Sequence, residues 1–200
     1  MRAICFLSAV AMRSTPSDRA EMVNQLLQGD TFEILEQQEK WTYIQCDYDG
    51  YKGWVDNKQW RPTSSQPNLT TGTDKSPTTY AKEHFLGAPY LWGGRTVMGI
   101  DCSGLTQVCF RACGIRLLRD ASQQSNQGIP VRDINDAQCD DLCFFCNEQN
   151  HIIHVGIYMG NNLIIHSSGQ VRIDSLTPEG IFNHDLNTIT HRLHSIRRLK

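Results

Sequence analysis

Short runs of alternating apolar and polar residues, separated by turn residues, fill the first 60 residues of this chain. Alternation of this kind predicts β-strands. The predicted strands cover residues 3–12, 31–37, 41–46 and 53–55. Residues 21–27 fit either a strand or a helical turn, because their periodicity favours neither. So many short strands predict a small all-β barrel over residues 1–60.

Residues 61–78 break this pattern. They are rich in Pro, Ser and Thr and carry almost no side chain that could be buried. Such a composition is typical of a linker that runs extended over the surface. We therefore divide the chain here and assign residues 79–200 to a second domain.

The second domain opens with helical spacing. Residues 80–86 predict a short helix that ends near Gly87. Residues 103–113 carry apolar side chains every three or four positions, and Gly114 suits the end of that helix. Residues 121–128 predict another short helix.

Apolar runs typical of strands follow the helices. They cover residues 142–146, 152–159, 163–166, 171–173 and 189–196. Helices followed by consecutive, antiparallel strands predict an α+β fold for the second domain.

Composition excludes several classes of function. The chain has 200 residues, of which 40% are hydrophobic and 20% charged, as in globular proteins. Its net charge of -2 gives no electrostatic reason to expect a nucleic acid partner. No apolar run is long enough to span a bilayer, so we expect no membrane partner.

The N-terminal apolar run has two interpretations. Residues 3–12 follow Arg2 and could be a short signal peptide, which would make the protein periplasmic or secreted if residues 1–12 belong to an export signal. No clear cleavage site follows, and removal would take a strand from the first domain. We favour a strand and a cytoplasmic protein, while a signal further upstream stays open.

Eight cysteines are spread along the chain. Several lie within apolar runs, where a free thiol packs as a small hydrophobic group, and this favours a reducing compartment. Cys139, Cys143 and Cys146 could form a zinc site with His151. However, residues 143–146 resemble a buried strand rather than a zinc knuckle, so we expect no metal and leave these three cysteines without a role.

Cys102 is the candidate nucleophile. It stands where the helix over residues 103–113 should begin, so backbone N–H groups and the helix dipole favour its thiolate. A nearby imidazole would lower its pKa further and accept its proton. The alternative is a structural cysteine at a helix start.

The runs 152–159 and 163–166 predict a hairpin around residues 160–162. A three-residue turn would make Met159 face Leu163. Asn tolerates the left-handed conformation that such a turn needs.

This turn would bring two histidines together. It places His166 opposite Gly156, so His154 and His166 share a face as diagonal neighbours about 7–8 Å apart at Cα. A two-residue turn would put them on opposite faces. The alternatives are a core histidine at 154 and a surface histidine at 166. The order thiol, base and orienting group instead predicts a cysteine hydrolase with Cys102, His154 and His166.

These residues resemble the NlpC/p60 family of papain-like cysteine peptidases. The similar segments are YLWGG (90–94), DCSGL (101–105), HVGIYMG (154–160) and IIHSSG (164–169). The resemblance implies that Cys102 is the nucleophile, His154 the base and His166 the orienting third member. It also implies an oxyanion hole that uses the backbone N–H of Cys102, and no cofactor. Asp140 stands where relatives often have Gly.

The first domain resembles the bacterial SH3-like domain that precedes some of these peptidases, through RSTPS (13–17) and GWV (53–55). In relatives that cleave free muropeptides, this domain supplies a Glu and a Tyr that hold the amine of an N-terminal L-Ala. Glu21 and Tyr51 stand at the similar positions. The resemblance adds Trp92, Asp101 and Ser103 to the substrate site, and a pair such as Glu21 and Asp101 would favour an ammonium group.

We therefore expect a monomeric cysteine peptidase that hydrolyses the γ-D-glutamyl–L-diamino acid bond of peptidoglycan stem peptides with a free N-terminal L-Ala, in cell-wall recycling. Intact wall peptide, whose L-Ala amine is blocked, would be rejected. The alternatives are an exported peptidoglycan hydrolase with a wall-targeting SH3-like domain, a catalytically silent wall-binding protein, and an acyltransferase. The sequence does not distinguish Lys from diaminopimelate at the diamino position.

Overall fold

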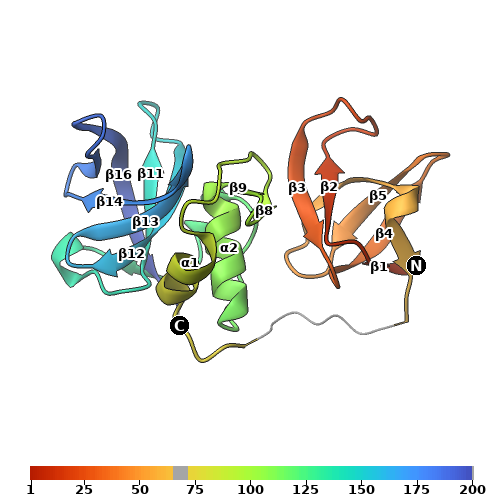
Figure 1. Ribbon diagram of the computed structural model, residues 1–200, viewed down its shortest axis with the longest axis horizontal. Coiled ribbons are helices and arrows are strands. Elements are labelled where there is room, and N and C mark those ends of the chain that lie inside the picture. The colour runs from red at the N-terminus through yellow and green to blue at the C-terminus, as the bar shows by residue number, and fades with distance from the viewer. Residues whose placement is uncertain (65–71, 200) are drawn as a thin grey trace.

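The structure is a computed structural model that describes residues 1–64 and 72–199. Two groups of strands lie at opposite ends of the molecule, and the two longer helices stand between them (Figure 1). The predicted linker, 61–78, includes residues 65–71, which lie outside the described residues. On either side of that gap, strand β7 ends at Pro62 and helix α1 begins at Pro77.

The N-terminal domain is a seven-stranded antiparallel sheet in the order β3-β2-β6-β5-β4-β1-β7. Its strands are β1 (Arg2–Cys5), β2 (Ala9–Arg13), β3 (Met22–Leu27), β4 (Thr31–Gln37), β5 (Trp41–Cys46), β6 (Lys52–Asp56) and β7 (Trp60–Pro62), with a short 3₁₀ turn, η1 (Asn57–Gln59). Alternate residues point into one core that includes Met12, Leu26 and Phe32. The all-β prediction for this domain is therefore confirmed.

Two local predictions change in this domain. The single strand expected over residues 3–12 is two strands, β1 and β2, because the chain bends between Cys5 and Ala9. The undecided segment 21–27 is a strand, β3, which pairs with β2 along its whole length. Sheet pairing, which leaves no trace in periodicity, selects the strand there.

The C-terminal domain packs helices on a sheet that closes on itself. The helices are α1 (Pro77–Phe85), α2 (Cys102–Ala112), α3 (Ala121–Gln124) and the 3₁₀ turn η2 (Ile134–Asp136). The strands are β10 (Ile129–Val131), β11 (Leu142–Cys146), β12 (Ile152–Gly160), β13 (Leu163–Ser168), β14 (Gln170–Leu176), β15 (Gly180–Asn183) and β16 (Thr188–Arg198), besides a small ribbon of β8 (Arg95–Thr96) and β9 (Gly99–Ile100).

The main sheet runs β10-β16-β11-β12-β13-β14-β15, and β15 also pairs with β16, so strands β11 to β16 form a barrel. Its outer face carries Phe144, Val155 and Ile165, which pack on α1 and α2. Its inner face carries Phe145 and Ile164 in a separate core. The α+β prediction is confirmed.

Some elements of this domain were expected at other lengths or not at all. The helix predicted over 121–128 ends at Gln124, in α3. Strands β10 and β15 were not predicted, because neither short run alternates clearly and both exist by pairing with β16. No helix of the described residues combines the length and apolar character needed to cross a membrane.

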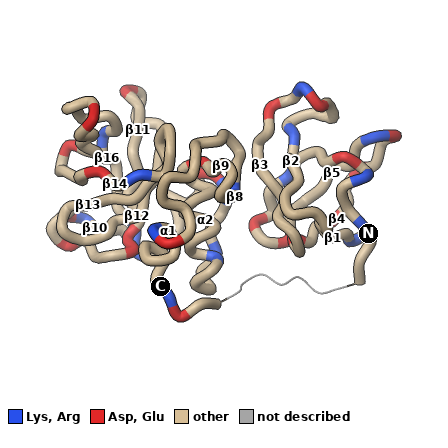
Figure 2. The backbone as a smooth tube through the Cα atoms, in the orientation of Figure 1, with Lys and Arg blue, Asp and Glu red and all other residues tan. Residues whose placement is uncertain are grey.

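The two domains meet through polar and charged contacts. Asp30 of the N-terminal domain lies between Arg95 (3.1 Å) and Arg111 (2.6 Å) of the C-terminal domain. Tyr48 places its hydroxyl 3.2 Å from the backbone nitrogen of Leu117. Charged residues of both signs are scattered over the backbone trace of both domains (Figure 2).

Candidate active site

Helix α2 begins at the candidate nucleophile. Asp101 is its N-cap, and Oδ1 of Asp101 accepts a hydrogen bond of 2.6 Å from the backbone N–H of Gly104. The other oxygen, Oδ2, accepts one of 2.8 Å from Gly93. Cys102 is thus the first residue of the helix, as predicted. The Asp101 side chain holds this helix start by its hydrogen bonds to Gly93 and Gly104.

Burial decides the charge of the Cys102 thiol. The residue is only 7% exposed, and burial raises its pKa to about 12, with a further increase from the Asp101 carboxylate. Backbone N–H groups of Val155 and Ser103 and the charge of Arg119 act in the opposite direction. The helix start therefore does not produce a resting thiolate, contrary to the expectation from the helix dipole alone.

The two histidines meet as predicted, by a different turn. His166 lies opposite Gly156, and His154 Nε2 lies 2.9 Å from His166 Nδ1. The turn has only two residues, Asn161 and Asn162, both with positive φ. Gly160 pairs with Leu163, so the prediction that Met159 faces Leu163 is wrong. A bulge between residues 158 and 160 restores the shared face, because one extra residue shifts the alternation.

His154 is buried and neutral. Burial, with repulsion from His191 and His166, holds the pKa of His154 well below its usual value. The ring of His191 stacks on that of His154 with centroids 4.1 Å apart. Nothing in the sequence pattern had pointed to His191. It reaches the site because β16 closes the barrel by pairing with β15.

The Cys102 sulfur approaches the backbone between His154 and Val155. It accepts a hydrogen bond from the Val155 N–H, and among the described residues no hydrogen bond joins it to the His154 ring. Catalytic hydrogen bonds are commonly long before substrate binds. The Cys102 thiol thus lies at the backbone of the residue that follows His154. Because both the thiol and the His154 imidazole are neutral, transfer of the thiol proton has to accompany attack on a substrate.

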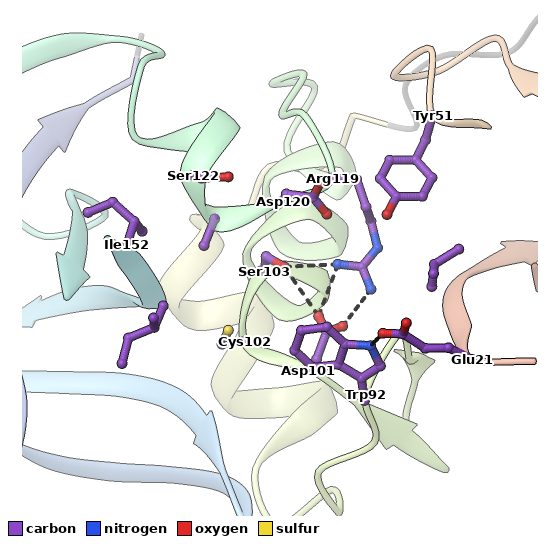
Figure 3. Close-up of a pocket in the computed structure, with 13 residues that line it drawn as sticks. Glu21, Tyr51, Trp92, Asp101, Cys102, Ser103, Arg119, Asp120, Ser122 and Ile152 are labelled. Carbon is purple, nitrogen blue, oxygen red and sulfur yellow. Dashed lines mark hydrogen bonds and ion pairs between the residues drawn. The ribbon is translucent and has the colours of Figure 1, made fainter. Parts of the chain in front are cut away.

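A cleft of about 480 Å³ opens beside Cys102 and has walls from both domains (Figure 3). Every predicted substrate-binding residue lines it. The lining comprises Glu21, Val23 and Tyr51 from the N-terminal domain and Trp92, Asp101, Cys102, Ser103, Arg119, Asp120, Ala121, Ser122, Ile152 and Ile153 from the C-terminal domain.

Glu21 and Tyr51 stand on the N-terminal wall. Oε1 of Glu21 accepts a hydrogen bond of 2.6 Å from the indole N–H of Trp92, which ties the two walls together. Tyr51 donates a hydrogen bond to Asp120, and burial raises the pKa of the Tyr51 hydroxyl to about 12, so that it stays a donor. Figure 3 shows Glu21 and Tyr51 on the same side of the cleft.

Asp101 forms a buried ion pair with Arg119. Oδ2 of Asp101 lies 2.6 Å from Nη2 of Arg119, and Nη1 of Arg119 also contacts Asp101 and Ser103, at 3.0 and 2.9 Å (Figure 3). The Arg119 Nε donates to Asn24 of the N-terminal domain. The Arg119 charge thus offsets that of Asp101, and Glu21 and Asp101 do not act as an isolated carboxylate pair.

Asp120 is a further carboxylate of the cleft lining, which no sequence pattern had singled out. Its partner in the cleft is the neutral Tyr51 hydroxyl, and burial raises the pKa of the Asp120 carboxyl, opposed by Arg119. The cleft lining then contains three carboxylates, Glu21, Asp101 and Asp120, against one guanidinium, Arg119. Arg119 and Asp120 directly precede the predicted helix at 121. A charged pair beside the N-terminus of a helix was the sequence signal that could have identified these two residues as part of the site.

The cysteines of the proposed zinc alternative lie in different surroundings. Cys143 is fully buried in the inner core of the barrel, whereas the Cys139 thiol lies 3.7 Å from Thr78 Oγ1 and is exposed. Among the described residues no group of three or more His, Cys, Asp or Glu could hold a metal.

The model of the NlpC/P60 family matches residues 87–190, more than half of the chain. This chain belongs to the NlpC/P60 family. The family is one of cysteine peptidases. A second model, described as the bacterial dipeptidyl-peptidase Sh3 domain, matches residues 12–59 of this NlpC/P60 chain.

Similar curated proteins include two named γ-D-glutamyl-L-lysine dipeptidyl-peptidase. The one from Bacillus cereus is 34% identical over 131 residues, covering 64% of this chain and 39% of the relative. The one from Bacillus subtilis is 44% identical over 85 residues, covering 42% of this chain and 28% of the relative. The chain thus spans less than half the length of these relatives.

Solved structures share the fold of this chain. An NlpC/P60 family protein from Bacillus cereus matches with a TM-score of 0.54 and 25% identity, over 98% of this chain and 62% of that one. NlpC1 from Trichomonas vaginalis matches with a TM-score of 0.52 at 22% identity, over 99% of this chain and 69% of that one, which shows the same fold.

Proposed function

We propose that this NlpC/P60 chain is a cysteine peptidase that cuts the γ-D-glutamyl–L-diamino acid bond of peptidoglycan stem peptides with a free N-terminal L-Ala. The observation that carries the proposal is the cleft beside Cys102, where three carboxylates face one guanidinium across two domains. An excess of carboxylates in a half-enclosed cleft favours an ammonium group over a neutral amide. The similarity to relatives named γ-D-glutamyl-L-lysine dipeptidyl-peptidase supports this substrate class.

The proposed reaction is acyl transfer through the thiol. The Cys102 sulfur attacks the γ-carbonyl carbon while His154 accepts the thiol proton, because both groups rest neutral. His154 then gives that proton to the leaving amine of the diamino acid. Water, deprotonated by His154, attacks the thioester and releases the dipeptide. His166 orients the base through its 2.9 Å contact.

The amine site of the proposal consists of Glu21, Tyr51 and Asp120. Trp92 holds the Glu21 carboxylate in place, and the Tyr51 hydroxyl does so for Asp120. Asp101 and Ser103 are positioned by Arg119 and form the floor next to Cys102. A dipeptide with its amine at these carboxylates would present its far carbonyl to the thiol.

A cytoplasmic, monomeric enzyme that recycles wall peptides completes the proposal. The preference for a free amine supports this role, since peptides inside an intact wall have that amine blocked. The eight cysteines, all of them free thiols, are consistent with a reducing compartment.

The test is hydrolysis of L-Ala-γ-D-Glu-diaminopimelate and the corresponding L-Lys peptide, each also in N-acetylated form. We expect cleavage of the free-amine peptides only, and its loss in Cys102→Ala. Glu21→Gln and Asp120→Asn should each lower kcat/KM about 10- to 100-fold, as for loss of a charge-assisted hydrogen bond. Glu33→Gln, at an exposed position of β4, is the control and should leave the rate unchanged.

Equal cleavage of free and acetylated peptides would retain the peptidase and contradict the amine site, which favours an exported wall hydrolase. Cleavage of neither form would contradict the peptidase and favour a wall-binding protein or another acyl substrate. The ratio between the two free-amine peptides gives the preference for diaminopimelate or Lys.

A further inference from the structure

A buried chain of polar groups continues beyond the two histidines. His166 Nε2 lies 3.1 Å from Oδ2 of Asp174. Asp174 and His166 are each 1% exposed, so water does not compete for this bond. No sequence pattern singled out Asp174, and the reaction proposed above does not use it.

The sheet register builds this chain. His166 of β13 lies opposite Arg172 of β14, which makes Asp174 its diagonal neighbour on the same face. The same relation joins His166 to His154, which stands two residues before its partner Gly156 on β12. Three adjacent strands therefore carry His154, His166 and Asp174 in diagonal steps across the inner face of the barrel.

Arg172 keeps Asp174 ionised. Its Nε lies 2.8 Å from Oδ2 of Asp174, and its Nη2 donates a hydrogen bond of 3.0 Å to Oδ1. Burial opposes ionisation, but the bonds from His166 and Arg172 outweigh it and hold the pKa of Asp174 below its usual value. An ionised carboxylate can only accept hydrogen bonds.

The ionised Asp174 determines the positions of the ring protons on both histidines. Because Asp174 only accepts, His166 must carry a proton on Nε2, and in its neutral form His166 then has a lone pair on Nδ1. That lone pair must accept from His154, so the proton of His154 lies on Nε2. Nδ1 of His154 is left without a proton, which is the state a general base requires.

We infer that Asp174 is a positioning residue that fixes the tautomers of His166 and His154 and thereby leaves Nδ1 of His154 free to accept the Cys102 proton. The inference rests on the proposed cysteine-peptidase function for its catalytic consequence, but the tautomers themselves do not depend on any substrate. Asp174 does not line the cleft beside Cys102, and among the described residues its side-chain hydrogen bonds are with His166 and Arg172, so it acts on the reaction through the histidines.

The test is the substitution Asp174→Asn. Nη2 of Arg172 donates to the Oδ1 position and therefore requires the amide oxygen there, whereas Nε of Arg172 makes no hydrogen bond to the Oδ2 position. The amide NH₂ then takes the Oδ2 position and donates to His166 Nε2. His166 must then carry its proton on Nδ1 and donate to His154 Nε2, which moves the proton of His154 to Nδ1. Both tautomers are thus expected to reverse.

Nuclear magnetic resonance of ¹⁵N-histidine-labelled protein reads these protons directly. In the wild type we expect Nε2–H on both rings, and in Asp174→Asn we expect Nδ1–H on both. Alkylation of Cys102 by iodoacetamide at neutral pH, followed by mass spectrometry of its peptide, should slow at least about tenfold, since a triad with the wrong tautomer loses its base. If the stem peptide is a substrate, kcat should fall with KM within about twofold.

Asp185→Asn is the matched control. Asp185 is an exposed carboxylate that lies 2.7 Å from Nη2 of Arg172, the nitrogen that also donates to Asp174. Among the described residues no hydrogen bond joins Asp185 to His154 or His166. Its substitution should leave the tautomers and the alkylation rate unchanged.

Unchanged tautomers in Asp174→Asn, or an alkylation rate within about twofold of the wild type, would overturn the inference. If that variant does not fold, the wild-type spectrum alone tests the inference. A proton on Nδ1 of His166 in the wild type would contradict the proposed series of hydrogen bonds from Asp174 through His166 to His154. A protein with the expected tautomers that cleaves no stem peptide would refute the proposed function and leave the positioning role intact.

Discussion

Arg119 links more of this molecule than any residue that the sequence singled out. Its guanidinium binds both oxygens of Asp101, the Ser103 hydroxyl and Asn24 of the other domain. It is only 2% exposed, and its attraction to Asp101 raises its pKa against the effect of burial. A buried ion pair of this kind specifies geometry, because removing one partner leaves a charge in a medium of low polarity.

Arg119→Met should therefore destabilise the protein strongly. Asp101 would keep its charge at the start of α2 without its guanidinium partner, and we expect a loss of about 3–5 kcal/mol in the free energy of unfolding. Urea denaturation at neutral pH measures it. Arg132→Met, at an exposed position, is the control and should change little. A loss below about 1 kcal/mol for Arg119→Met would show that Asp101 finds other compensation.

Helix α2 illustrates how an element is fixed by its neighbours. Its third residue, Gly104, faces the loop that carries Trp92, and an added Cβ would lie 2.3 Å from the backbone oxygen of Gly94 and 2.9 Å from Oδ1 of Asp101. The glycine thus allows the helix start and the loop to touch. Close approach, rather than backbone angles, explains the glycine here, because Gly104 has ordinary helical geometry.

Two physical effects predict changes of opposite sign in the free energy of unfolding of Gly104→Ala. Helix propensity alone predicts a gain of up to about 1 kcal/mol, because Ala is the better helix former. The close contact predicts a loss of about 1–3 kcal/mol, because backbone atoms must move. We expect the loss, measured as a lower urea midpoint, together with a slower reaction of Cys102 with iodoacetamide. A more stable variant would contradict the packing seen at Gly94.

The first turn of helix α1 is stabilised by Asp140, an aspartate with an unusual backbone conformation. Asp140 adopts φ of 72°, in the region that favours glycine, and its Oδ1 accepts a hydrogen bond of 2.7 Å from the backbone N–H of Thr78. The sequence analysis noted that Asp replaces a frequent Gly at this position. The hydrogen bond to α1 offsets the strain and gives the aspartate a purpose that Gly could not serve.

At the scale of the whole molecule, Asp30 joins the domains. Burial works against its ionisation, but Arg95 and Arg111 outweigh that effect and hold the pKa of Asp30 below its usual value. All three side chains belong to the contact surface between the N-terminal sheet and the C-terminal domain. The cleft depends on this contact, because two of its walls come from different domains.

Asp30→Asn should weaken the contact between domains. Arg95, which is buried, would lose its carboxylate partner, and we expect a loss of about 3 kcal/mol or more in the free energy of unfolding. Calorimetry should show the single transition of the wild type dividing into two. Asp18→Asn, at an exposed ion pair of the same domain, should leave the profile unchanged. A single, unshifted transition in Asp30→Asn would contradict the role of this contact.

The neutral histidines make stability depend on pH. Burial first, and His166 second, lower the pKa of His191 to about 4 from 6.5, and burial also lowers that of His154. The unfolded chain therefore binds more protons than the folded one below pH 6.5, and stability present above 6.5 is lost as pH falls toward 4. For a fully buried histidine such as His154 the slope is about 1.4 kcal/mol per pH unit.

His191→Phe tests this dependence. The ring preserves stacking on His154 but cannot take up a proton, so the fall in the urea midpoint between pH 7 and pH 5 should be smaller than in the wild type. The effect is less than the full slope for a buried group, because His191 is partly exposed. Parallel profiles for the two proteins would contradict a neutral His191.

The sequence by itself determined what depends on neighbours along the chain. Strands β4 and β5 follow from the alternation of apolar residues, strand β11 follows from a continuous apolar run, and helix α2 follows from apolar residues at helical spacing. The order of Cys102, His154 and His166 predicted the nucleophile and the histidine pair, because a hairpin fixes which residues share a face.

Only the tertiary structure decided what depends on residues far apart in the chain. Arg119 and Asn24 are separated by 95 positions, and no local pattern announces their hydrogen bond. The closure of the barrel by β15 and β16 brings His191 onto His154, and the register of β13 with β14 brings Asp174 to His166. Burial, which sets the charge of the Cys102 thiol, is likewise a property of the packed molecule, because it depends on every chain segment that excludes water from the site.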